Sequence, residues 1–300
     1  MIDRREFMNS VIWAGVLFYT RPSRLPARER GAWKLAADFP YRFKTVSVQH
    51  VHELGEWMHK LARDGKISDN TIFRGYIDKF VYEPEKMAKD ARSLVILAIP
   101  QNIISVVFRL KGRSCEVLTP TGYFLDGLNP EDVKNRVKSE IVRDPTATLY
   151  PGPRLPLKTL AVRSGLAEYG RNNITYVLPD YGSTHRLVGY YVNRELPDNW
   201  RPLKMMESCR HCSICRRRCP TGAIGVETFV IDAGKCLTLF NERPEPLPSW
   251  IDPRAHNALV GCNRCQERCP ANVDAYNRIE RLAELTEQET ECILNLSPDQ

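Results

Sequence analysis

Eight cysteines in the last third of the chain have the residue type and spacing of metal-cluster ligands. Four of them form one run, with two, two and three residues between successive cysteines and a proline directly after the last: Cys209, Cys212, Cys215 and Cys219. Thiolates at this spacing bind the iron atoms of a [4Fe–4S] cluster, and the cysteine before the proline serves a second cluster. The run therefore predicts a partner motif elsewhere in the chain.

A second cysteine motif supplies that partner. Cys262, Cys265 and Cys269 repeat the end of the first run, including the proline after the last cysteine, and Cys236 precedes them. The motif predicts a crossed assignment of ligands. We expect the first cluster to be held by Cys209, Cys212, Cys215 and Cys269, and the second by Cys219, Cys236, Cys262 and Cys265.

Two other uses of cysteine compete with this interpretation. Four-cysteine zinc sites also contain pairs of cysteines two residues apart, and they would make the chain a zinc-bound interaction module. Disulfides do not fit, because the spacings match metal ligation and the chain is not a small secreted scaffold. The two remaining cysteines, Cys115 and Cys292, lie in apolar or amphipathic stretches, where we expect small packing residues.

The N-terminal residues have features of a targeting segment. Arg4 and Arg5 precede an uncharged run, residues 9–19, that is too short to span a bilayer as a helix. The arginine pair resembles a twin-arginine export signal, and the run fits the apolar part of such a signal. An amphiphilic extension is the alternative. Export, membrane association through the N-terminus and a cytoplasmic location therefore all stay open.

The pattern of apolar residues divides the rest of the chain into three parts. After a linker that ends near residue 42, residues 43–200 alternate between helical and strand patterns and predict an α/β domain. We expect the cluster domain at 201–275 and a helical tail at 276–300. A continuous apolar run at 94–100 predicts a buried strand, and residues 157–169 predict a helix that ends at Gly170.

The composition limits the function further. No G-x-G-x-x-G or P-loop motif supports nucleotide binding, and no G-x-S-x-G motif supports triad hydrolysis. The net charge of +7 permits an acidic partner. Arg210 and Arg216–Arg218 crowd the first cysteine run, where they form either a surface that attracts an acidic electron donor or an ordinary solvated face.

Residues 90–273 resemble the epoxyqueuosine reductase family. The resemblance rests on Ser164-Gly165-Leu166, Gly170-Arg171-Asn172 and the cysteine pattern with Gly261 before it. Reductive dehalogenases are similar in architecture. The resemblance implies an α+β protein with a nitroreductase-like, corrinoid-type α/β domain followed by a bacterial ferredoxin-like two-cluster domain. It also implies cobalamin between them, with Ser164, Gly165, Gly170, Arg171 and Asn172 as cofactor-binding residues.

The chain departs from the family pattern at two places. The aspartate that the family proposes as proton donor is replaced by Pro151, so its neighbour Tyr150 becomes the candidate donor. The sequence stops at Gln300, before the helical repeats that help the family to bind tRNA. These departures make tRNA a doubtful partner and leave the substrate as a small molecule or a modified base.

The sequence thus predicts an iron–sulfur oxidoreductase. Low-potential electrons from a ferredoxin or flavodoxin would pass through the two clusters to a corrinoid or a substrate in the N-terminal domain. The alternative is a non-enzymatic electron-transfer subunit that docks a redox partner.

Overall fold

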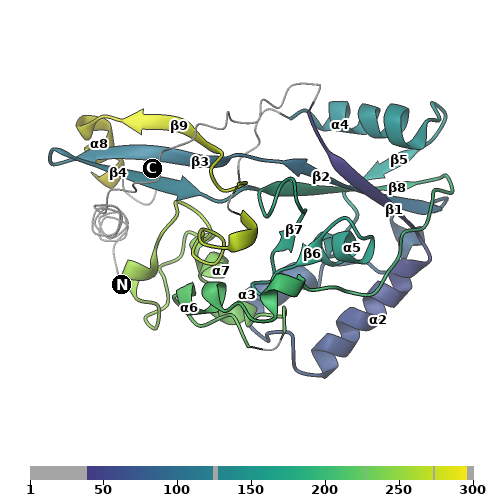
Figure 1. Ribbon diagram of the computed structural model, residues 1–300, viewed down its shortest axis with the longest axis horizontal. Helices are drawn as coiled ribbons and strands as arrows, with labels where there is room; N and C mark the ends of the chain where they lie inside the picture. The colour runs from purple at the N-terminus through teal and green to yellow at the C-terminus, as the bar shows by residue number, and fades with distance from the viewer. Residues whose placement is uncertain (1–38, 124–127, 227, 273, 296–300) are drawn as a thin grey trace.

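A computed structural model describes residues 39–123, 128–226, 228–272 and 274–295 (Figure 1). The export signal predicted at Arg4 and Arg5 lies outside these residues. In the part of the chain that the model describes, no helix has the length and apolar character needed to cross a membrane.

The central element is a four-stranded antiparallel sheet in the order β1-β2-β8-β5. Its strands are β1 (Arg42–Ser47), β2 (Ser93–Pro100), β8 (His185–Val192) and β5 (Leu149–Pro151). Every residue of β2 is buried, which confirms the strand predicted from the apolar run. Because side chains alternate along a strand, β2 contributes Leu94, Ile96 and Ala98 to one face and Val95, Leu97 and Ile99 to the other.

Helices cover both faces of this sheet. One face packs against α2 (His50–Arg63) and α5 (Leu157–Arg163). The other face packs against α4 (Pro130–Arg136) and the π-helical turn Val137–Val142 that continues it. Two shorter helical segments follow α2 in the chain, α3 (Thr71–Ile77) and the 3₁₀ turn Pro84–Lys86. The side chain of Asn70 caps α3 by accepting hydrogen bonds from the amides of Ile72 and Phe73.

A second sheet, in the order β4-β3-β9, extends beyond the first. The strands β3 (Ile103–Leu110) and β4 (Arg113–Thr119) form a hairpin, whose turn places Lys111 and Gly112 at positive φ. The tail was expected to be helical, but it begins with the strand β9 (Ile279–Leu285), which pairs in parallel with β3. Within the described part of the tail, only α8 (Glu287–Asn295) is helical, and Thr286 and Glu289 form a capping box at its start.

Two other predicted elements differ in the structure. The helix expected to run to Tyr169 ends at Arg163, because Gly165 adopts a φ of 79° and the amide of Leu166 bonds back to Ala161. The chain then forms the short pair β6 (Glu168–Tyr169) and β7 (Thr175–Tyr176). The strand expected at 229–231 does not form there, and Phe229 instead stacks on Tyr169 with ring centroids 4.2 Å apart.

The cluster segment lies below the β3–β4 hairpin in Figure 1 and beside the first sheet. It contains the short helices α6 (Ile214–Arg218) and α7 (Leu237–Asn241). Its 3₁₀ turns are Glu207–Cys209, Ala233–Lys235, Pro253–Ala255 and Pro270–Asn272. The domain boundaries at 200 and 275 stay a prediction.

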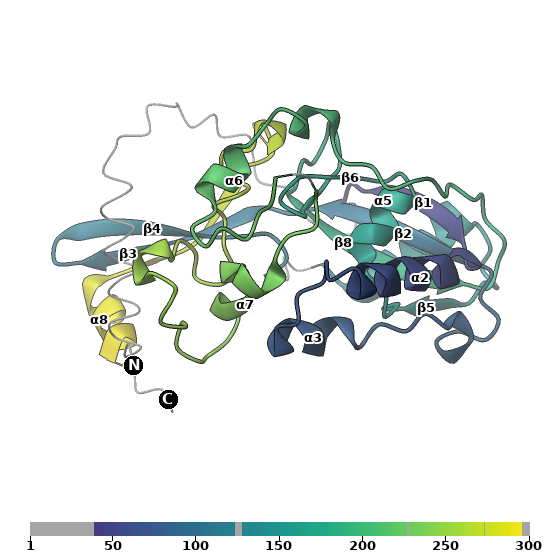
Figure 2. The same ribbon diagram turned by 90° about the horizontal axis from the view of Figure 1, so that it is seen from below.

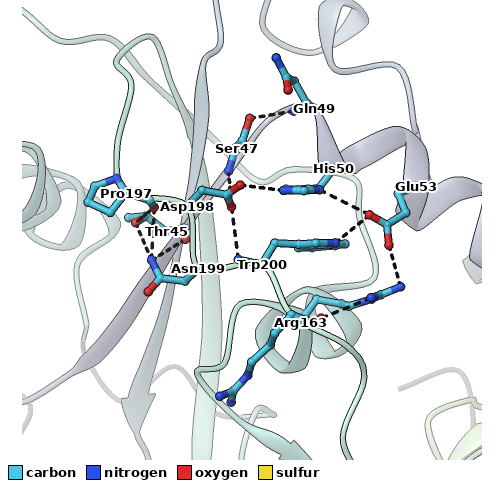
Figure 3. A network of polar contacts seen from close by, with 11 residues as sticks. Thr45, Ser47, Gln49, His50, Glu53, Arg163, Pro197, Asp198, Asn199 and Trp200 are labelled. Atoms are coloured by element: carbon cyan, nitrogen blue, oxygen red, sulfur yellow. Dashed lines mark hydrogen bonds and ion pairs between the residues drawn. The ribbon is translucent and has the colours of Figure 1, made fainter.

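A polar network attaches the linker at residues 197–200, which precedes the cluster segment, to α2 and α5 (Figure 3). The imidazole of His50 lies 2.8 Å from the carboxylate of Asp198 and stacks on Trp200 with centroids 4.4 Å apart. The guanidinium of Arg163 lies 4.9 Å from the centre of the same indole and forms an ion pair with Glu53. The linker is therefore held at a fixed position on the α/β fold.

The packing of α2 generates a stability prediction. A Cβ atom at Gly55 would lie 2.8 Å from Cβ and Cγ of Tyr82, atoms too close to the backbone to move freely. We expect Gly55→Ala to lower the free energy of unfolding by about 1–3 kcal/mol. Gly75→Ala is the control, because no heavy atom lies within 4 Å, and it should stabilise α3 by about 0.5–1 kcal/mol. Equal urea midpoints for the two variants would contradict this packing.

Candidate metal centres

Two cavities divide the eight cysteines into two groups of four. A small cavity of about 20 Å³ is lined by Cys209, Cys212, Cys215 and Cys269. A second cavity, of about 430 Å³, is lined by Cys219, Cys236, Cys262 and Cys265. These are the groups of the crossed assignment, although cluster binding by them stays a prediction.

The exchange of ligands between the two cavities has a local cause. Cys215 lies within α6, but Cys219 follows the helix with φ −70° and ψ 115°, an extended conformation. A residue before proline is disfavoured in the helical region, so Pro220 forces the chain to leave α6 at this position. The thiol of Cys219 is thereby directed away from the cavity that its three predecessors line. Pro270 follows Cys269 in the same way.

The donor set in each cavity suits an iron–sulfur cluster. Burial raises the pKa of Cys215 to about 11, with further increases from Cys209 and Cys269. Burial also raises the pKa of Cys262 to about 11. Four thiols gathered at one site ionise together only next to a compensating cationic centre, which an iron core provides. Among the described residues, no three His, Cys, Asp or Glu side chains are arranged around a single metal ion.

Two residues of the predicted Gly-Arg-Asn segment brace the cysteine loops through backbone carbonyls. The buried Arg171 donates to the carbonyl of Cys209 at 2.5 Å and to that of Cys212 at 3.2 Å. The buried Asn172 donates to the carbonyl of Cys265 at 3.2 Å. These side chains therefore fix both cysteine motifs relative to the α/β fold.

The other three residues predicted to bind a cofactor have different positions. Gly170 lines the small cavity, and a Cβ there would lie 2.5 Å from both Asn172 and Tyr176. Ser164 and Gly165 line neither cysteine cavity. They end α5, where the hydroxyl of Ser164 donates to the carbonyl of Ala161. Cofactor binding by Ser164 and Gly165 stays a prediction, and the role that the structure shows for them is to end the helix.

A third cavity, of about 580 Å³, adjoins the second cysteine group. We call it the aromatic cleft. Cys236, Leu157 and Lys158 line both this cleft and the second cysteine cavity. Its walls include the aromatic side chains Trp57, Phe73, Tyr76, Phe80, Tyr169 and Phe229. The cleft can therefore enclose a flat apolar group beside the second cysteine group.

The sequence analysis missed two polar groups at this junction. The ammonium group of Lys158 donates to Oδ1 of Asn173 at 2.8 Å and to its carbonyl at 3.1 Å. The side chain of Lys158 is accessible to solvent through the cavities. Desolvation by the protein atoms around it nevertheless lowers the pKa of its ammonium group. The hydroxyl of Tyr123 lines the second cysteine cavity and donates to Glu242, which lines the aromatic cleft.

Tyr150, the predicted proton donor, lies elsewhere. It belongs to β5, which forms one edge of the first sheet, and it lines none of these three cavities. Its hydroxyl donates to Oδ1 of Asp90 at 2.7 Å. Proton donation by Tyr150 stays a prediction, and its position at the edge of the sheet does not support it.

The class of the cluster segment follows from its match to a known family. Residues 208–272 match the family described as a 4Fe-4S double cluster binding domain. The chain therefore contains such a domain at its C-terminal side.

Its relatives are epoxyqueuosine reductases, and the chain is homologous to them. It is 37% identical to the enzyme of Synechocystis over 117 residues, which cover 38% of this chain and 39% of that protein. It is 26% identical to the Staphylococcus aureus enzyme over 200 residues, covering 66% and 46%. The chain thus matches less than half the length of these curated relatives.

A solved structure shares the fold. The epoxyqueuosine reductase of Streptococcus thermophilus matches 85% of this chain and 69% of its own, with a TM-score of 0.57 and 17% identity. The mixed α/β fold with a C-terminal cluster domain is therefore confirmed.

The comparisons also correct the prediction that tRNA is a doubtful partner. An epoxyqueuosine reductase with an epoxyqueuosine-modified tRNA-Tyr stem loop matches 79% of this chain, with a TM-score of 0.51 and 21% identity. The position at which the sequence ends was the wrong criterion, because a protein with this fold has been solved with a tRNA stem loop.

The crossed cysteine groups generate a prediction about cluster ligands. Cys219→Ser should damage the second cluster, although its neighbours in sequence line the other cavity. We expect its low-temperature electron paramagnetic resonance spectrum to match that of Cys265→Ser and to differ from that of Cys212→Ser. A Cys219→Ser spectrum that matches Cys212→Ser would overturn the assignment.

The hydrogen bonds from Arg171 to the cysteine loop generate a second prediction. Arg171→Gln leaves buried carbonyls of the Cys209 loop unsatisfied, which costs about 1–3 kcal/mol. We expect a chelator to remove iron from the first cluster faster in this variant than in the wild type. The exposed Arg154→Gln is the control. Equal rates of iron loss in both variants would show that the brace does not stabilise the first cluster.

Proposed function

We propose that the protein is an iron–sulfur reductase, in which two [4Fe–4S] clusters deliver low-potential electrons to a reaction in the aromatic cleft. The observation that carries the proposal is that Cys236 lines both the second cysteine cavity and the cleft. A cluster held there would lie directly beside whatever the cleft encloses. Iron–sulfur clusters with cysteine ligands supply electrons one at a time at potentials low enough for difficult reductions.

The finer proposal is that a corrinoid binds in the cleft. Residues 43–200 would then form a nitroreductase-like, corrinoid-type domain. The cleft fits the flat ring of such a group, because Tyr169 and Phe229 present stacked rings and Trp57 lies 6.5 Å from Phe229. When bound, a corrinoid supplies a cobalt centre that is a strong reductant in its lowest oxidation state.

The residues of the chain itself would exclude water and supply protons. The aromatic walls keep the cleft apolar, which strengthens electrostatic interactions within it. Lys158 carries a proton at Nζ. Its hydrogen bonds to both oxygens of Asn173 hold the ammonium group at the junction of the cleft and the second cysteine cavity. Burial and the bond to Glu242 raise the pKa of Tyr123, so its hydroxyl stays protonated at neutral pH. Lys158 and Tyr123 would take the role of the aspartate that the family has where this chain has Pro151.

For the substrate, we propose a modified nucleoside of tRNA. The proposal is supported by the homology to epoxyqueuosine reductases and by the solved relative with a modified stem loop. Loss of an epoxide oxygen as water, which leaves a carbon–carbon double bond, needs two electrons and two protons. The two clusters would provide the electrons one at a time, and Lys158 and Tyr123 would provide the protons. A small organic molecule is the alternative substrate, and an electron-transfer subunit without its own substrate is the alternative function.

Anaerobic purification tests the proposal. Two clusters require about eight iron and eight sulfide per chain and a brown colour, whereas zinc sites give a colourless protein. With a chemical reductant and added corrinoid, we expect the chain to reduce an epoxyqueuosine-containing stem loop. A fully loaded protein that turns over neither this RNA nor the free nucleoside would contradict the proposed reductase and support an electron-transfer subunit.

Lys158 offers a sharper prediction within the same assay. Lys158→Met removes the proton donor and should lower the rate of product formation by about 10²–10⁴-fold, while iron and sulfide stay at the wild-type level. The control is Lys60→Gln, an exposed cation of α2 that lines no cavity described above. A wild-type rate in Lys158→Met would exclude this lysine as the proton donor.

A further inference from the structure

The two cysteine groups differ in what lies next to them. The second group borders the aromatic cleft through Cys236, whereas the small cavity of the first group shares no lining residue with the cleft. Cys212, Cys215 and Cys269 of the first group are partly exposed, as are all four cysteines of the second group. If electrons leave the chain at the cleft, the first cluster, which does not border the cleft, is the one left to receive them.

Arginines neighbour the cysteines of the first group in the sequence. We call Arg210, Arg216, Arg217, Arg218 and Arg268 the arginine collar. Arg210, Arg216 and Arg217 lie on or beside α6, and Arg268 precedes Cys269; all four are exposed. In Figure 2, α6 lies on the side of the cluster segment away from α3 and α7, two helices that border the cleft.

The collar carries more positive charge than its acidic neighbours balance. Glu207 forms an ion pair with Arg210 at 3.0 Å. Glu267 is shared by Arg218 at 3.1 Å and Arg264 at 3.7 Å. Among the described residues, no carboxylate forms an ion pair with Arg216, Arg217 or Arg268. Three exposed guanidinium groups therefore face solvent beside partly exposed cysteines.

We propose that the arginine collar is the docking surface for an acidic electron-donor protein, a step that rests on the proposed function. Complementary charge accelerates encounter and fixes the orientation of the partners. In the docked complex, the reduced cofactor of the donor loses one electron and the oxidised first cluster gains it. Two such transfers supply a two-electron reduction in the cleft. No proton is transferred and no covalent bond forms or breaks at the collar.

RNA is also attracted to arginine, because its phosphates are negatively charged. The position of the collar favours the protein donor. Residues of α3 line the cleft. In Figure 2, α6 lies on the side of the cluster segment away from α3, so an RNA bound along α6 would have to pass the cluster segment to place its base there. A donor protein needs only to approach the first cluster.

The test uses the cluster-loaded protein and a reduced acidic flavodoxin. The collar variant carries Arg216→Gln, Arg217→Gln and Arg268→Gln. We expect its Kd for flavodoxin, measured by calorimetry at low salt, to rise about 10- to 100-fold, because three charges of the interface are lost. The rate of cluster reduction by flavodoxin should fall similarly, while reduction by dithionite keeps the wild-type rate. High salt should remove most of the difference.

The matched control changes the net charge equally at a distance from the collar. It carries Lys89→Gln, Arg92→Gln and Arg154→Gln, three exposed cations of the α/β fold that line no cavity described above. We expect wild-type affinity for flavodoxin. Equal Kd values for the collar and control variants would overturn the proposal. Iron content and the dithionite rate distinguish lost docking from a damaged cluster.

Two further outcomes separate this proposal from the others. If the collar variant loses affinity for the tRNA stem loop and keeps its reduction by flavodoxin, the surface binds RNA and the donor proposal is overturned. If flavodoxin reduction depends on the collar and no substrate is turned over, the docking surface stands and the reductase proposal fails.

Discussion

The arrangement of both cysteine groups depends on one backbone constraint, the exclusion of helical conformation before proline. It ends α6 at Arg218 and gives Cys219 an extended conformation, so that this thiol lines the other cavity. The same dipeptide at Cys269 and Pro270 returns a thiol to the first group. Each group therefore contains residues from both motifs, and neither can be complete unless the two motifs meet.

The second organising interaction joins the cluster segment to the α/β fold. Arg171 and Asn172 reach across from the loop between β6 and β7 and donate to carbonyls next to the cysteines. Because they bind backbone carbonyls, they set the position of the cysteine loops. The stacking of Phe229 on Tyr169 adds a second contact between the same two parts of the chain. The proposed electron path depends on this fixed geometry.

The sequence predicted those features that local chemistry determines. The cysteine spacing, the all-apolar strand β2 and the Thr286–Glu289 capping box each lie within a few residues, and the structure contains the corresponding groups and elements. The features that the sequence did not predict depend on contacts between distant segments. The aromatic cleft and Lys158 were missed because no spacing relates Trp57, Lys158 and Phe229.

The parallel pairing of β9 with β3 changes how the cluster segment relates to the rest of the molecule. The chain returns after its last cysteine motif to build the outer strand of a sheet that begins at Ile103. The cluster segment thus has strands that pair with the α/β fold on both sides of it in the sequence, β8 before it and β9 after it. Shortening the chain after the cysteines would expose the edge of β3, whose unpaired amides and carbonyls would invite association with another chain.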